Sequence, residues 1–207
     1  MDERQSLRMT IRQRRTKLDP AWCDASSALI CKHLADSWLY RRAKHIAFYF
    51  ALGNEAKLEL LMHDAWSRGK QVYLPILGLR YSGQLWFVPC QPSTPLYKNH
   101  FGIAEPVHAP HERRVQLRSL DMILMPLVAF DQTGNRLGMG GGFYDKTLAS
   151  LQASCASWSR PKRIGIAYDM QRVAAIPGED WDVPLDSVVT ESGLQWFKRG
   201  TTCNTGS

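Results

Sequence analysis

The sequence lacks long apolar runs. None of its apolar stretches approaches the roughly 20 residues that a membrane-spanning helix needs. Its first residues, 1–4, are polar and charged, with no apolar segment behind them. We therefore expect no membrane span and no secretory signal, and a cytoplasmic location by default.

Paired metal-ligating cysteines are also absent. The cysteines are odd in number and scattered, without C-x-x-C spacing: Cys23, Cys31, Cys90, Cys155 and Cys203. This pattern indicates reduced thiols rather than a disulfide framework or a zinc site. His108 and His111 are spaced closely enough to share a metal, but no further ligand accompanies them, so we expect surface-loop histidines.

What is present suits one globular domain. The chain has 207 residues, 44% of them hydrophobic, and shows no internal repeat or linker. We expect a domain over residues 1–197 and a flexible tail over 198–207. The formal charge of +7, from 26 basic and 19 acidic residues, favours an anionic partner without identifying it.

Alternating strand and helix patterns predict an α/β fold. Residues 45–51 form a dense apolar run, as in a buried parallel strand. A helical pattern ending at Gly69 and a strand over 71–75 complete a βαβ unit, for which parallel strands are expected. Further strands are predicted over residues 84–88, 121–125 and 163–168. The seven tryptophans are expected to line the core and a cleft.

Two helices are predicted near the amino terminus. In the first, residues 3–18, an apolar face accompanies a basic stripe of Arg4, Arg8, Arg12 and Arg15. The stripe has two readings from the residues alone, a solvated face or an RNA-binding arm. The second helix begins at the Asp19-Pro20 start signal, and its buried stripe is expected to comprise Trp22, Ala25, Leu29, Ile30 and Leu34.

A glycine-rich stretch is the most informative part of the chain. Four glycines lie within the five positions 138–142, a density that excludes a packed helix or strand. The predicted strand 121–125 precedes it, and a helical face of Tyr144, Leu148 and Leu151 follows. Free loop amides at a helix start, beside Arg136, favour anion binding. The pattern matches neither the Walker nor the dinucleotide fingerprint, so a tight turn into a helix remains the alternative.

Asp145 favours the nucleotide interpretation. A carboxylate in the first turn of a helix is ordinary, but beside phosphates it would repel them unless a cation lay between. Arginine, glycines and an aspartate together suit a nucleotide with Mg²⁺.

The stretch 136–145, Arg-Leu-Gly-Met-Gly-Gly-Gly-Phe-Tyr-Asp, resembles the signature of the 5-formyltetrahydrofolate cyclo-ligase family, also called methenyltetrahydrofolate synthetases. Three flanking pieces resemble the family too, in the same order, and the resemblance runs from about residue 4 to residue 193. The three pieces are 101–106, 126–131 and 182–191.

The resemblance implies a fold and a reaction. We expect a single α/β domain with a mostly parallel sheet flanked by helices, like the sugar-isomerase and CoA-transferase folds. The implied reaction closes 5-formyltetrahydrofolate to 5,10-methenyltetrahydrofolate with ATP and Mg²⁺, releasing ADP and phosphate. In the family's chemistry the formyl oxygen attacks the γ-phosphate, and the folate's 10-nitrogen then displaces phosphate from the resulting imino-phosphate.

The resemblance also implies roles for individual residues. Arg136 and Asp145 are the expected catalytic residues, and Asp145 and Asp186 the expected Mg²⁺ ligands. The expected ATP-binding residues are Arg4, Arg8, Arg136, Leu137, Gly138, Met139, Gly140, Gly141, Gly142, Phe143 and Tyr144. The expected folate-binding residues are Phe50, Glu55, Met139, Gly140, Gly141, Gly142 and Phe143.

The chain departs from the family pattern at three positions. Arg4 stands where lysine is common, Lys57 where an acidic residue is common, and Trp181 where histidine is common. Two alternative functions stay open: a sugar-phosphate enzyme of the same fold, and a non-enzymatic basic protein that binds RNA through the first helix. The order of motifs along the chain favours the cyclo-ligase, with small-molecule substrates and without a membrane or nucleic acid partner.

Overall fold

The computed structural model describes residues 2–78, 83–107, 114–151 and 160–198. His108 and His111 lie outside the described residues, as do Cys155, Cys203 and the predicted tail beyond Lys198. The three described cysteines, Cys23, Cys31 and Cys90, are buried free thiols. Burial raises the pKa of Cys31 to about 11, so this thiol is protonated at neutral pH and is a poor nucleophile.

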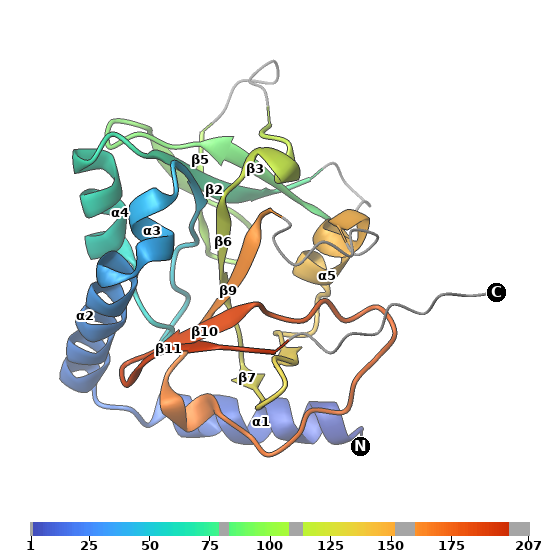
Figure 1. Ribbon diagram of the computed structural model, residues 1–207. Coiled ribbons are helices and arrows are strands. Elements are labelled where there is room, and N and C mark those ends of the chain that lie inside the picture. Colours follow the sequence, from blue (N-terminus) through green and yellow to red (C-terminus); the bar gives the residue numbers. More distant parts are fainter. Residues whose placement is uncertain (1, 79–82, 108–113, 152–159, 199–207) are drawn as a thin grey trace.

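A seven-stranded sheet forms the centre of the fold, in the order β11-β10-β9-β6-β1-β2-β3 (Figure 1). The four pairings from β10 to β2 are parallel, whereas the two edge strands β3 and β11 pair antiparallel. The predicted mostly parallel α/β sheet is therefore confirmed. The strands of the sheet are β1 (His45–Ala47), β2 (Gln71–Leu77), β3 (Leu85–Pro89), β6 (Met122–Pro126), β9 (Lys162–Ile166), β10 (Ser187–Thr190) and β11 (Gly193–Trp196).

Two small hairpins and a set of helices surround this sheet. The hairpins pair β4 (Leu96–Lys98) with β5 (Ala104–Pro106) and β7 (Ala129–Phe130) with β8 (Arg136–Leu137). The α-helices are α1 (Glu3–Thr16), α2 (Pro20–Asp36), α3 (Trp38–Arg42), α4 (Glu59–Ser67) and α5 (Phe143–Leu148). Short 3-10 helices are η1 (Leu117–Ser119), η2 (Ala149–Leu151) and η3 (Asp169–Gln171).

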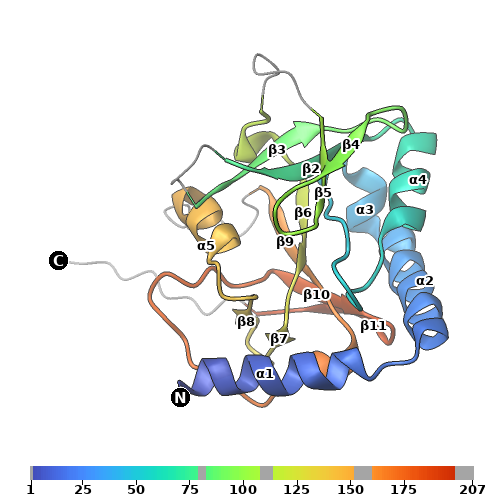
Figure 2. The ribbon, with the colours of Figure 1, turned by 180° about the vertical axis from the view of Figure 1, so that it is seen from behind.

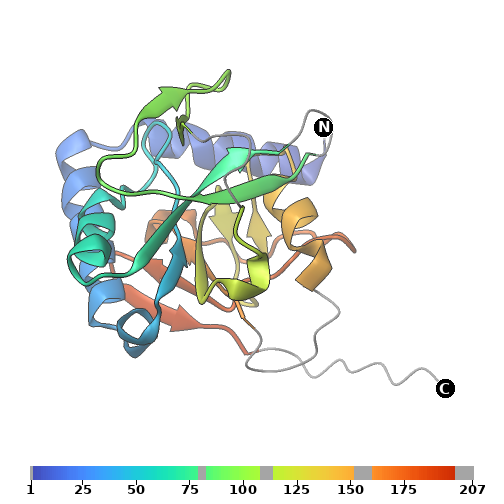
Figure 3. The ribbon, with the colours of Figure 1, turned by 90° about the horizontal axis from the view of Figure 1, so that it is seen from above.

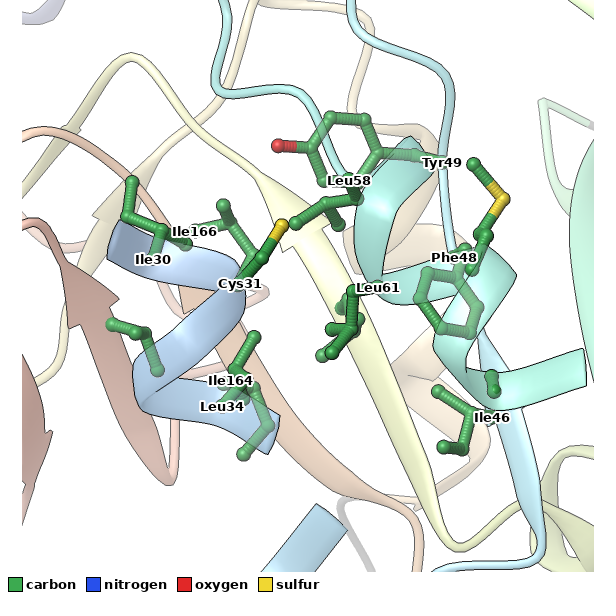
Figure 4. Close-up of a cluster of buried hydrophobic side chains, with 14 of the residues drawn as sticks. Ile30, Cys31, Leu34, Ile46, Phe48, Tyr49, Leu58, Leu61, Ile164 and Ile166 are labelled. Carbon is green, nitrogen blue, oxygen red and sulfur yellow. The ribbon is translucent and has the colours of Figure 1, made fainter. Parts of the chain in front are cut away.

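Both faces of the sheet are buried. Successive side chains of each strand point to opposite faces, and each face packs into its own hydrophobic cluster. In β6, Leu124 packs on the side of α2 and α4, whereas Ile123 packs on the opposite side. Figure 3 shows α2, α3 and α4 gathered on one side of the sheet and α5 on the other. The close-up in Figure 4 shows the first side, where Ile30 and Leu34 of α2 face Ile164 of β9.

The predicted buried stripe of α2 is wrong in its phase. Trp22, Ala25 and Leu29 are exposed, whereas Ile30 and Leu34 are buried as expected. The residues that complete the buried face are small and partly polar: Cys23, Ser26, Ser27 and Cys31. A face of this composition has little hydrophobic contrast, so the pattern of large apolar residues pointed to the wrong side.

The tryptophans also differ from the prediction. Trp22, Trp38, Trp181 and Trp196 are all exposed. The prediction that the tryptophans line the core and a cleft is therefore wrong in its core part for these four. Trp38 and Trp196 stack on each other, with ring centroids 6.3 Å apart. Apolar area on a large amphipathic ring is often left at the surface.

Helix α1 runs across the carboxyl ends of the parallel strands, at the bottom of Figures 1 and 2. Asp2 caps its first turn by accepting a hydrogen bond from the Arg4 N–H. Its buried side chains are Arg4, Ile11 and Arg15, so the apolar face and much of the basic stripe point the same way, into the protein. In open α/β sheets, ligands bind at this edge.

Candidate active site

The glycine loop (residues 138–142) is held in place by the β7–β8 hairpin that precedes it. The hairpin turns around Asp131, which is almost fully buried and accepts hydrogen bonds from the Thr133 and Asn135 N–H groups at 2.9 and 3.0 Å. The other carboxylate oxygen of Asp131 accepts the Ile176 N–H at 3.1 Å. Burial opposes the ionisation of Asp131, but these hydrogen bonds outweigh it and lower its pKa. Several hydrogen bonds to one ionised carboxylate therefore hold the hairpin turn that leads into the glycine loop.

The glycine loop itself has no regular secondary structure, as its glycine density predicts. Gly140 and Gly142 have φ values of +111° and +65°, in the left-handed region where a side chain is strained. Gly142 is the N-cap of α5, which has only 6 residues. A helix this short has a weak dipole, so the loop amides and neighbouring arginines must supply most of the attraction for an anion.

Arg136 and Asp145, the two expected catalytic residues, form a buried ion pair. Arg136 Nη2 lies 2.6 Å from Asp145 Oδ1, with 3% and 16% of the two side chains exposed. The same oxygen of Asp145 accepts the Val183 N–H at 3.2 Å. Burial lowers the pKa of Arg136, and the charge of Asp145 opposes that shift. Among the described residues nothing accepts a hydrogen bond from Arg136 Nε.

Helix α1 directs three of its arginines into the protein. Arg8 Nε donates to the carbonyl of Gly138 at 2.9 Å, which places Arg8 directly on the glycine loop. Arg15 Nη2 lies 3.7 Å from Glu55 Oε1, with under a tenth of either side chain exposed. Arg12 alone of the stripe is exposed. A solvated helix face is therefore the wrong interpretation for Arg4 and Arg15.

Arg4 makes a two-pronged ion pair with Asp182. Its Nη1 and Nη2 atoms lie 2.5 and 3.1 Å from the two carboxylate oxygens, and Nη1 also donates to the Pro177 carbonyl at 2.9 Å. Burial disfavours the charged form of Asp182, but the hydrogen bonds from Arg4 and the Glu179 N–H outweigh it and lower its pKa. A fork of this kind is available to arginine and not to lysine, which gives the Arg4 departure from the family pattern a local purpose.

Glu55 lies near the other end of α1. It is buried, and its Oε2 accepts the Leu52 N–H at 3.0 Å. Asn54 Nδ2 donates to the Arg15 carbonyl at 3.1 Å, which ties this turn to the helix. Burial raises the pKa of Glu55, and the Leu52 hydrogen bond and the charge of Arg15 only partly offset the shift. A buried carboxylate at this edge of the sheet is suited to accept hydrogen bonds from a polar ligand.

Aromatic contacts connect the glycine loop with the β4–β5 hairpin. Phe101, half exposed, meets Phe143 edge to face, with ring centroids 6.2 Å apart. Glu105 holds this hairpin by accepting hydrogen bonds from Tyr97 Oη and Asn99 Nδ2, both at 2.7 Å. The family-like segment 101–106 thus lies beside the loop that follows β8, and the two rings together offer an apolar surface for a flat ligand.

Two of the departures from the family pattern have exposed side chains. The Lys57 ammonium pairs with Asp24 of α2 at 2.6 Å, and both side chains are more than half exposed. Trp181 is exposed as well, at 63%. Neither side chain has a described contact with the glycine loop.

The two predicted Mg²⁺ ligands differ in how well they fit a metal. Asp145 uses one oxygen for Arg136 and Val183, and no described residue donates a hydrogen bond to its other oxygen. Asp186 is buried, and Arg163 binds both its oxygens at 3.0 and 3.2 Å, with a third bond from the Arg163 N–H at 2.8 Å. Within the described ranges no three potential metal ligands cluster together. Both aspartates are therefore ion-paired, but only Asp145 keeps an oxygen without a described protein donor.

Sequence reasoning missed two features of this site: the buried ion pair of Arg15 with Glu55 and the pairing of Asp182 with Arg4. Their partners lie far along the chain: 178 residues separate Arg4 from Asp182, and no local motif reports such a contact. Arg15 could have been found from its phase, because it follows Ile11 by one helical turn and so shares the buried face.

Comparison with known proteins places the chain in a family. The model of the 5-formyltetrahydrofolate cyclo-ligase family matches residues 1–191. A 5-formyltetrahydrofolate cyclo-ligase of Haemophilus influenzae is 38% identical, over 90% of this chain and 97% of its own. The Escherichia coli K12 cyclo-ligase is 36% identical, over 90% of this chain and 100% of its own. The chain belongs to the 5-formyltetrahydrofolate cyclo-ligase family.

Solved structures agree with this fold. The structure of Aquifex aeolicus 5,10-methenyltetrahydrofolate synthetase has a TM-score of 0.78 and 27% identity, covering 97% of this chain and 96% of that one. A Mycoplasma pneumoniae 5,10-methenyltetrahydrofolate synthetase, at 23% identity, shares the fold with a TM-score of 0.70, covering 92% of this chain and 99% of that one.

Among the described residues, no helix is both long and apolar enough to cross a membrane.

Proposed function

We propose that the chain closes 5-formyltetrahydrofolate to 5,10-methenyltetrahydrofolate, consuming ATP and releasing ADP and phosphate. Beside the family membership, one contact carries the proposal: Arg8 of α1 lies on the glycine loop, 130 residues further along the chain. A guanidinium beside main-chain amides is suited to the phosphates of a nucleotide. The expected ATP-binding residues of the helix and of the loop therefore belong to one region.

The folate is proposed to occupy the side that holds Phe50, Glu55 and Phe143. The Phe101–Phe143 contact supports this assignment, because it joins the glycine loop to the hairpin that resembles the family's folate side. Helix α1 connects the two halves, with Arg8 at the loop and Arg15 against Glu55. Such an arrangement would hold the formyl oxygen near the terminal phosphate, and positioning is the main contribution of a protein to this kind of chemistry.

Protein groups in this proposal orient the reactants and balance charge. When the formyl oxygen attacks the γ-phosphate, Arg8 and the loop amides would stabilise the phosphate oxygens. Arg136 is buried beneath the loop, so we assign it the role of holding Asp145 and compensating its charge. When the 10-nitrogen attacks the imino-phosphate carbon, the carbon–oxygen bond breaks and phosphate leaves, and Phe143 and Phe101 would keep the ring system in place.

Mg²⁺ is proposed to be held by Asp145 together with the phosphates of the nucleotide. One or two carboxylates plus substrate phosphates are a common way to bind this ion, and Asp145 has the oxygen to offer. When bound, the ion would neutralise phosphate charge. Asp186 stays a prediction from the family resemblance, and it would have to release Arg163 before it could take part.

The assay is the appearance of the methenyl absorbance band after the protein is mixed with 5-formyltetrahydrofolate, with ATP and without it. We expect the band only with ATP, and its formation should stop when divalent cations are chelated. Purified, folded protein that forms no band with ATP and Mg²⁺ present would overturn the proposal. A sugar-phosphate activity or RNA binding would then be examined next. The cytoplasmic location and the absence of a nucleic acid partner stay predictions from the sequence.

A further inference from the structure

A hollow lies at the amino ends of β1 and β2, whereas the glycine loop lies toward the carboxyl ends of the parallel strands. It has a volume of about 670 Å³ and is lined by residues 41–45 and 68–71, which we call the basic hollow. Five of these nine residues are arginine or lysine. The C-terminal ends of α3 and α4 border it, on the upper left of Figure 1, whereas α1 lies at the bottom of that view.

Two carboxylates near the basic hollow already have partners. Asp64 accepts a hydrogen bond from Tyr40 Oη at 2.7 Å and pairs with Arg68 at 2.8 Å. Asp121 accepts the N–H groups of Lys44 and His45 at 2.7 and 2.9 Å. The other oxygen of Asp121 pairs at 2.7 Å with Arg160, which is outside the lining. Neither carboxylate therefore pairs with the side chains of Arg41, Arg42 or Lys44.

One of the five cations has a structural task. Lys70 Nζ donates to the carbonyls of Tyr40, Arg41 and Ala43 at 2.9, 3.2 and 2.7 Å, which closes the end of α3. Burial and the charge of Arg68 lower the pKa of Lys70, as expected where positive charges gather. Arg41, Arg42 and Lys44 are exposed, and in the described ranges none of the three forms an ion pair.

We propose that the basic hollow binds a compact polyphosphate-type anion, meaning two or more linked phosphate groups. Guanidinium forks and an ammonium around one concave surface match the several oxygens and charges of such a ligand. A nucleic acid is a poorer match, because the lining offers no aromatic ring for base stacking apart from His45. The Nδ1 atom of His45 lies 3.0 Å from Tyr73 Oη, so that ring is already engaged. The site is independent of the proposed cyclo-ligase activity.

The test is a titration of the full, ¹⁵N-labelled chain with inorganic tripolyphosphate, followed by amide NMR shifts. Backbone amides of residues 41–45 and 68–71 should shift in a saturable way that weakens as salt is added. Resonances from the glycine loop report separately on the proposed nucleotide site. Failure at one site thus leaves the other measurable.

Two triple variants with equal charge change make the test specific. R41Q/R42Q/K44Q removes the unpaired cations of the basic hollow and should weaken tripolyphosphate binding there at least about tenfold. The control R14Q/K32Q/K198Q removes three exposed cations scattered elsewhere and should leave that binding unchanged. Thermal melts of both variants establish that each is folded.

Several results would overturn the proposal. Unsaturable shifts, or equal weakening by both triple variants, would mean that only net charge attracts the anion. Citrate binding as tightly as tripolyphosphate at the same amides would show that linked phosphates are not what the hollow selects. A single-stranded oligonucleotide that shifts these amides while tripolyphosphate does not would replace the proposed ligand class with nucleic acid.

Discussion

Replacing Asp145 with asparagine removes the negative charge from the ion pair under the glycine loop. The shape of the side chain stays nearly the same. Asp145 Oδ1 accepts from Arg136 Nη2 at 2.6 Å and from the Val183 N–H at 3.2 Å. Asparagine can keep both contacts through its amide oxygen, but the negative charge is lost. Arg136, with 3% of its side chain exposed, would then be a buried cation without a counter-charge from Asp145.

The expected cost follows from the burial of the two partners. Removing one partner of a buried pair costs about 3–5 kcal/mol, and the partial exposure of Asp145 favours the lower end, about 3 kcal/mol. Domains are stable by about 5–15 kcal/mol, so the variant should still fold. At about 2–4 °C per kcal/mol for a chain of this size, the melting temperature should fall by about 6–12 °C.

A double-mutant cycle of Asp145→Asn and Arg136→Met, followed by thermal and urea unfolding, measures the pair directly. We expect the double variant to lose clearly less stability than the sum of the single variants, because Arg136→Met removes the unpaired cation. Strictly additive effects, or an unchanged melting temperature for Asp145→Asn, would refute the pairing in solution.

Turnover measurements then separate the metal role from the structural one. Asp145→Asn should need more Mg²⁺ to reach the half-maximal rate, because it removes a hard anionic ligand. Asp186→Asn breaks a comparable buried pair with Arg163, so it should lower stability, and an unchanged Mg²⁺ requirement would remove Asp186 from the predicted ligands. A raised Mg²⁺ requirement in Asp186→Asn would instead show that Arg163 releases this carboxylate in the loaded enzyme.

Three further predictions concern α1 and its partners. Arg8→Ala should raise the KM for ATP about tenfold or more, the cost of one charge-assisted phosphate contact, whereas exposed Arg12→Ala should not; equal steady-state kinetics for both would make Arg8 structural. Glu55→Gln should weaken folate binding in calorimetry and spare nucleotide binding; equal loss of both ligands would contradict its place on the folate side. Because the pKa of Asp182 is lowered in the folded protein, its contribution to stability is present above its unfolded pKa of about 3.9 and is lost as pH falls through the folded value. Asp182→Asn should therefore flatten the loss of stability below about pH 4 in urea titrations; an unchanged slope would contradict the pairing with Arg4.

The parts of the fold that the sequence predicted well are those with a local cause. Four glycines in five positions allow little except a loop, and the apolar run at 121–125 became β6 with a shift of one residue. The strand predicted at 45–51 is right at its start, but β1 ends at Ala47. Residues 48–51 are apolar because they line the core beside Glu55, and composition alone does not separate a buried strand from a buried irregular segment. The prediction for helix α2 failed for a different reason: cysteines and serines line much of its buried face, so the pattern of apolar residues does not mark that face.

The basic stripe of α1 marks where local reasoning about charge fails. A row of arginines reads as a solvated face because exposed cations cost nothing to leave in water. At the carboxyl edge of a parallel sheet the balance changes, because loops leave carbonyls there without partners in a ladder. Arg4 binds the Pro177 carbonyl and Arg8 the Gly138 carbonyl, at distances of 173 and 130 residues along the chain. Arginine suits this task because its fork of N–H donors serves both carbonyls and carboxylates. In the proposed site, the side chains that hold these loops together would also meet a bound phosphate, so binding and loop stability at this edge would depend on the same groups.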